Sequence, residues 1–258
     1  MTANSTLAVD MARGQTHTEP ARWLRFLSRW AAVAGLAQLA LMGVFVGGIG
    51  SPPSDTASGP EYVELMQAVR SPVLYRVAML FDALGWALMG GILLALALLL
   101  WRRRPIRAAM IAACALGLVS GVLGGFTRLV GVSDLASRYI SVPALQASLL
   151  QGYLVLQEVI SACFAAGDLL AGAAYLLAAW CLFSFAGFPR WLALWLGAAG
   201  SMSLALFAIA AIGAFSFPFL LLTMLVLIGS NIALTLALWN PSASLISAIG
   251  DAGEAGMR

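Results

Sequence analysis

The chain has little of the chemistry that metal and redox sites need. Its only histidine, His17, lies in a polar N-terminal stretch, and Cys114, Cys163 and Cys181 all lie in apolar segments without CxxC spacing. Imidazoles and closely spaced thiolates are the usual ligands of zinc, haem and iron–sulfur clusters, and a disulfide framework needs paired cysteines. The sequence therefore predicts no metal, no cofactor and no disulfide.

Charge is also scarce. Charged residues make up 10% of the chain, and lysine is absent, so that all 14 basic residues are arginine. We interpret the use of arginine alone as the codon bias of a GC-rich bacterial genome. A soluble domain carries about 25% charged residues, and the arginines here lie at the ends of apolar segments, where they indicate membrane topology. The composition thus argues against a soluble protein and against nucleic acid as a partner.

Long apolar runs make up most of the sequence. Hydrophobic residues make up 62% of the 258 residues, and the mean hydropathy is +0.94. A run of about 20 apolar residues matches the roughly 30 Å hydrocarbon core of a lipid bilayer. The pattern predicts an all-α integral membrane protein, a bundle of six transmembrane helices at residues 30–49, 77–101, 108–129, 160–185, 191–212 and 219–239.

Two polar tails flank the predicted transmembrane domain of residues 23–240. Residues 1–22 lack the apolar core of a signal peptide, and their small polar residues predict a disordered N-terminal tail. Residues 241–258 are rich in small residues and are predicted to form a mobile C-terminal tail.

Arginines indicate which end of the bundle faces the cytoplasm. They gather before the first span, between spans two and three, and between spans four and five, at residues 22, 25, 29, 102, 103, 104, 107 and 190. Six spans place all of these on one side. By the positive-inside rule, we expect that side and both termini in the cytoplasm, in a bacterial inner membrane.

One stretch leaves the number of spans open. Residues 145–185 would form a straight helix about 60 Å long, twice the hydrocarbon thickness. Residues 140–158 mix glutamines with leucine and valine, so they form either an interfacial helix or part of a seventh span. Seven spans would place Arg190 on the opposite side from the arginines at 102–107, and we therefore expect six.

Three charged residues are expected at a similar depth in the bilayer. Counting about 20 residues from the arginine-rich side along spans two, three and four reaches Asp82, Arg128 and Asp168. Charges at that depth are costly unless they pair or line a wet cavity, and they indicate a candidate functional site. Four further charged residues form the expected outer rim: Arg76, Asp134, Arg138 and Glu158. The alternative is that these residues only mark helix ends at the water interface.

Catalytic motifs are absent from the sequence. There is no HExxH, GxSxG or P-loop pattern, and no histidine lies in a span, so we expect neither an enzyme nor a catalytic residue. One function that remains is permeation of a small molecule or ion through an outward-facing site at Asp82, Arg128 and Asp168. The other is a non-catalytic scaffold or accessory subunit with a membrane-protein partner, in which these residues form a closed network. A lipid-modifying enzyme would have to work with carboxylates alone.

Several short motifs resemble a bacterial membrane family. They are the Tyr75–Arg76 pair followed by Asp82, Arg128 within TRLV, Asp168 in its span, and FPRWLALWLGAAG at residues 188–200. Over residues 30–240, the chain resembles the six-span family known only as a domain of unknown function, number four-three-eight-six. The resemblance implies a six-span inner-membrane protein, and it implies no particular activity because that family has none established.

Overall fold

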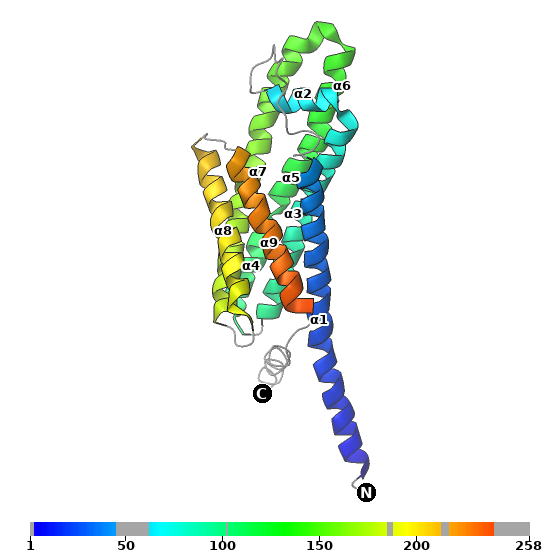
Figure 1. Cartoon of the computed structure of the whole chain (residues 1–258), viewed down its shortest axis with the longest axis vertical. Coiled ribbons are helices and arrows are strands. Elements are labelled where there is room, and N and C mark those ends of the chain that lie inside the picture. The colour runs from blue at the N-terminus through cyan, green and yellow to red at the C-terminus, as the bar shows by residue number, and fades with distance from the viewer. Residues whose placement is uncertain (1–2, 45–61, 102, 185–187, 213–216, 240–258) are drawn as a thin grey trace.

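The fold is an all-α bundle, as the sequence predicts. The computed structural model describes residues 3–44, 62–101, 103–184, 188–212 and 217–239, and within these ranges every regular element is helical. Long helices lie side by side, and shorter ones cover one end of the bundle (Figure 1).

Six helical segments in the described part of the chain are long and apolar enough to cross a membrane, which fits a multi-pass membrane protein. Four of these segments lie in single helices: α1 (Ala3–Val44), α3 (Pro72–Leu100), α8 (Arg190–Ala211) and α9 (Phe217–Trp239). Another is the run of α4 (Pro105–Gly117), α5 (Val119–Thr127), η3 (Arg128–Val132) and α6 (Ser133–Ser141). The remaining one is the run of η4 (Pro143–Leu145) and α7 (Gln146–Phe183). A short helix, α2 (Val63–Arg70), precedes α3.

The N-terminal helix starts earlier than expected. α1 begins at Ala3, so residues 3–22 continue the helix where the sequence predicts a disordered tail. Their alanine, leucine, methionine and arginine residues are good helix formers, although only Arg22–Val44 is apolar enough to span a membrane. The predicted C-terminal tail of residues 241–258 and the end of the first predicted span, residues 45–49, lie outside the described residues.

Residues 146–158 are neither a separate interfacial helix nor a seventh span. They are the first part of α7, a single helix of 38 residues that projects beyond the ends of α8 and α9 (Figure 1). Two of the three glutamines of this part form hydrogen bonds with residues outside α7. Gln146 donates a hydrogen bond to the Tyr139 carbonyl of α6, and Gln157 donates one to Glu64 of α2. Packing against α2 and α6 thus explains a polar stretch at the start of a spanning helix.

The spanning helices form a closed ring. α1 packs along α3 and α9, α4 packs along α3 and α7, and α8 packs along α7 and α9. At one end of this ring, buried apolar side chains such as Leu24, Leu96, Leu182, Leu192 and Leu238 fill the interior. The interior of the other half is less completely filled.

The two ends of the ring differ in charge. Arg104 donates a hydrogen bond of 3.3 Å to the Ser184 hydroxyl, and the Arg107 guanidinium lies 3.8 Å from the centre of the Trp180 ring. Both arginines lie where the turn between α3 and α4 meets the last turn of α7. We call this end of the ring the arginine end. The short helix α2 lies across the opposite end, the α2 end (Figure 1).

Glycine brings α5 against α3 and so sets the distance between their polar residues. A Cβ atom built on Gly125 would lie 2.9 Å from the Ala83 Cα and 3.0 Å from its backbone nitrogen. Such close approach of two helices is typical of small-residue faces in membrane proteins. Gly125 stands one turn before Arg128, and Ala83 follows Asp82, so this contact places the arginine beside the acid.

Candidate functional site

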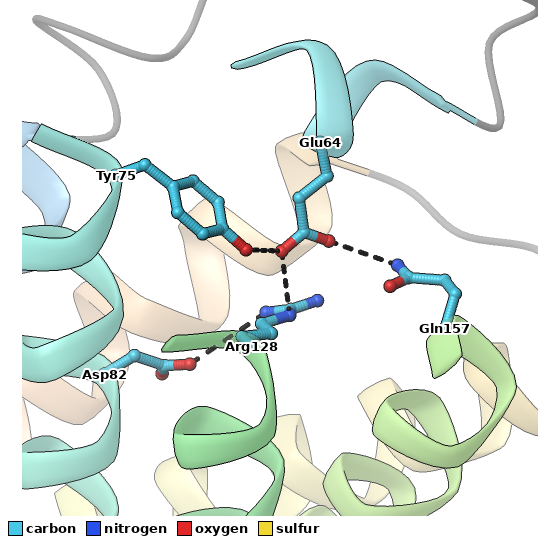
Figure 2. A network of polar contacts seen from close by, with 5 residues as sticks. All are labelled: Glu64, Tyr75, Asp82, Arg128 and Gln157. Atoms are coloured by element: carbon cyan, nitrogen blue, oxygen red, sulfur yellow. Dashed lines mark hydrogen bonds and ion pairs between the residues drawn. The ribbon is translucent and has the colours of Figure 1, made fainter. Parts of the chain in front are cut away.

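Glu64 of α2 is the centre of a polar network at the α2 end (Figure 2). Its Oε1 accepts a hydrogen bond of 2.6 Å from the Tyr75 hydroxyl, and its Oε2 accepts one of 3.2 Å from Gln157 Nε2. Arg128 Nε lies 3.1 Å from Oε1. Glu64 therefore joins α2 to α3, η3 and α7 at once.

Arg128 lies between two carboxylates. Besides its ion pair with Glu64, its Nη1 is 3.9 Å from Asp82 Oδ2, and its guanidinium carbon is 4.6 Å from the centre of the Phe164 ring. Arg128 is the first residue of the π-helical segment η3. Such segments are rare and occur frequently at functional sites. The charge of Arg128 is stabilised by the two carboxylates and by the face of the Phe164 ring.

A cavity of about 790 Å³ extends from this network into the ring. Residues from all of the long helices α1, α3, α7, α8 and α9 line it, and α2 contributes Val63, Glu64 and Gln67 at its end. Most of the wall is apolar, with Leu41, Met89 and Met224 among the lining residues. Its size lies within the roughly 300–1,000 Å³ of known small-molecule sites.

Asp168 lines the same cavity from α7. It stands one helical turn beyond Phe164, the residue whose ring contacts Arg128. No residue in the described ranges forms a hydrogen bond or ion pair with it. Asp168 is thus a carboxylate that faces a mostly apolar cavity and has no partner within the part of the chain that the structure describes.

The structure brings together part of the predicted site. Arg128 and Asp82 form an ion pair, and Asp168 shares their cavity without pairing with Arg128. The four rim residues do not line the cavity.

The rim residues point elsewhere because of their position around each helix. Arg76 and Glu158 are exposed, each one residue beyond a side chain of the network, Tyr75 or Gln157. Successive residues of an α-helix are turned by about 100°, so the neighbour of an inward-facing residue faces away. Asp134 and Arg138 pair with each other at 2.9 Å on the exposed face of α6. The four residues expected as a rim therefore lie outside the lining of this cavity.

Glu64 is the main residue that sequence reasoning missed. Glu64 lies on the short helix α2, and its side chain lines the end of the cavity. A signal was present: Leu65 and Ala68 are three residues apart and buried, and Glu64 and Gln67, also three apart, line the cavity. Residues three apart share one side of a helix, so this helix has an apolar side and a neighbouring polar one.

The hydroxyl of Tyr75 offers a test of the network. Tyr75→Phe removes the hydrogen bond to Glu64 in a buried position, and we expect the free energy of unfolding to fall by about 1.5 kcal/mol, as for bonds to charged groups. The measurement is thermal unfolding of the purified protein in detergent. Tyr139→Phe is the control, because the Tyr139 hydroxyl has no hydrogen-bond partner in the described part of the chain. Equal stability of the two variants would contradict the network.

Among the described residues, no group of three or more histidine, cysteine or acidic side chains is arranged to hold a metal ion. No protein-family model, curated protein or solved structure matches the chain. The cavity and its charges are therefore the basis on which a function can be assigned.

Proposed function

We propose that the protein binds a small molecule or ion in the cavity of the helix ring and lets it cross the membrane there. The observation that carries this proposal is the carboxylate of Asp168, which lines a cavity of about 790 Å³ and has no hydrogen-bond or ion-pair partner among the described residues. A charge at this depth is costly when it has no partner, and such residues mark pathways for ions and substrates in membrane proteins. A purely structural role would not explain why an acidic residue lines this cavity without a polar contact to the described residues.

The proposal includes an orientation. The arginine end and both termini face the cytoplasm of a bacterial cell, and the α2 end faces outward from the inner membrane. Arg104 of the turn between α3 and α4 and Arg107 of the first turn of α4 support this orientation, because arginine and lysine are enriched on the cytoplasmic side of membrane proteins. In this orientation the network of Glu64, Arg128 and Asp82 lies at the outer mouth of the cavity.

The scaffold function is the second candidate, and the network itself favours it. Arg128 has two acidic partners, and Glu64 is bonded on both oxygens. Such a network fixes α2, α3, η3 and α7 relative to one another whether or not anything passes. The two functions differ in whether water and solutes reach the region around Asp168.

Cysteine labelling distinguishes these functions. In a background with Cys114, Cys163 and Cys181 replaced by alanine, we compare Ala165→Cys, whose position lines the cavity, with Ala166→Cys, whose position is exposed on the outer surface of the helix ring. We expect a membrane-impermeant methanethiosulfonate to modify the first at least tenfold faster, because a thiol facing hydrocarbon neither ionises readily nor meets the reagent.

The sidedness of labelling tests permeation. Right-side-out and inside-out vesicles expose the α2 end and the arginine end, respectively, in the proposed orientation. A permeation pathway gives reaction at Ala165→Cys in both kinds of vesicle, with the faster reaction in right-side-out ones. Reaction in one kind only would reject permeation and leave a binding site, and no reaction above that of Ala166→Cys in either would favour the scaffold.

A further inference from the structure

The charges that line the cavity do not balance. Its described lining residues include three acids, Glu64, Asp82 and Asp168, and one cation, Arg128. Glu64 and Asp82 share that cation through their ion pairs. With all four groups ionised, the lining carries an excess of two negative charges. An anion would meet repulsion here, whereas a cation would be attracted.

Asp168 is the place where a cation would be held. An ionised carboxylate accepts hydrogen bonds at both oxygens, and in the described part of the chain no donor reaches those of Asp168. Burial of a carboxylate without a partner is unfavourable. A bound cation would supply the missing charge and thereby be selected over a neutral molecule of the same shape.

The walls favour an organic cation over a metal ion. Calcium and magnesium need six or more oxygen ligands including waters, and no cluster of acidic residues suited to a metal occurs in the described ranges. Instead, Trp86 and Phe164 line the cavity, with ring centres 5.9 Å apart. Aromatic faces attract organic cations, and the apolar side chains of Met89 and Leu227 suit an apolar body.

We propose that the cavity selects a lipophilic organic cation, with the positive centre near Asp168 and the apolar body between the aromatic and aliphatic walls. The inference rests on the proposed function and names the class of molecule that it concerns. Its three elements are the acidic excess, the unpartnered carboxylate and the aromatic pair, and all belong to one cavity.

Two probe ions of the same shape and opposite charge test this inference. Tetraphenylphosphonium and tetraphenylborate have nearly equal size and apolar surface. For the full chain in lipid nanodiscs, with each radiolabelled ion measured separately, we expect saturable binding of tetraphenylphosphonium and no saturable binding of tetraphenylborate. Asp168→Asn is expected to weaken binding at least tenfold, and Asp168→Glu, which retains the charge, to keep most of it. Asp134→Asn, on the exposed face of α6, is the control and should bind as the unaltered protein does.

Each remaining outcome has a definite meaning. Equal uptake of both ions, unchanged in Asp168→Asn, would show partition into lipid and overturn the inference. Preferred binding of tetraphenylborate would reverse the proposed charge selectivity. Loss of binding in both Asp168 variants with unchanged thermal unfolding would reject the charge argument. Fast labelling of Ala165→Cys without any binding of the cation would leave the proposed permeation function standing and reject the ligand class alone.

Discussion

Replacing Arg128 with methionine is expected to lower the free energy of unfolding by about 3 kcal/mol. The substitution keeps a long side chain in place but leaves Glu64 and Asp82 without their shared cation. Removing one partner of a buried ion pair is far more costly than replacing both, because the remaining charge stays buried. Unfolding of the purified protein in detergent, by heat or by denaturant, measures the effect.

Arg138→Met is the matched control. It removes the same side chain from an ion pair with Asp134 of 2.9 Å that is exposed on α6, and surface pairs contribute about 0–1 kcal/mol. Adding Asp82→Asn to Arg128→Met should recover part of the lost stability, since it removes one of the two stranded acids. Equal stability of Arg128→Met and Arg138→Met would mean that the network does not stabilise the bundle.

The second large effect is expected at Gly125. In Gly125→Ala, the new methyl group would lie 2.9 Å from the Ala83 Cα, and because that atom belongs to the backbone, α5 and α3 must move apart. Overpacking of this kind typically costs about 1–3 kcal/mol. The shift also moves Arg128 away from Asp82, which lengthens an ion pair of 3.9 Å. The measurement is again unfolding in detergent.

Gly152→Ala separates the effect of crowding from that of helix propensity. Gly152 is also helical, but a Cβ there would meet nothing within 4 Å, so alanine should leave stability unchanged or raise it slightly. A Gly125→Ala variant as stable as Gly152→Ala would show that α3 and α5 do not approach as closely as described.

The levels of Arg128 and Asp82 along neighbouring helices could be predicted because the rise per residue of a helix is constant. Apolar runs of about 20 residues identified the six spanning segments, and counting along them placed Arg128 beside Asp82. Counting along a helix does not give the direction in which each side chain points, and Arg76 and Glu158 are exposed rather than part of the cavity lining.

The cavity and its cover depend on tertiary packing that the apolar pattern does not contain. Whether the short helix around Glu64 lies beside the bundle or across its end depends on its contacts with α6 and α3. In the same way, the packing of the helices pairs Arg128 with Glu64 and Asp82 and leaves Asp168 lining the cavity. A carboxylate on a spanning helix predicts a polar site, and the structure alone tells which partner it has.

Glu64 is the member of the network that a spanning helix does not carry. Its partners Tyr75, Arg128 and Gln157 belong to α3, η3 and α7, so α2 cannot swing away from the bundle without breaking all three contacts. That movement would also strip the arginine of one counter-charge. Uncovering the α2 end of the cavity and changing the charge balance of its lining would consequently occur together.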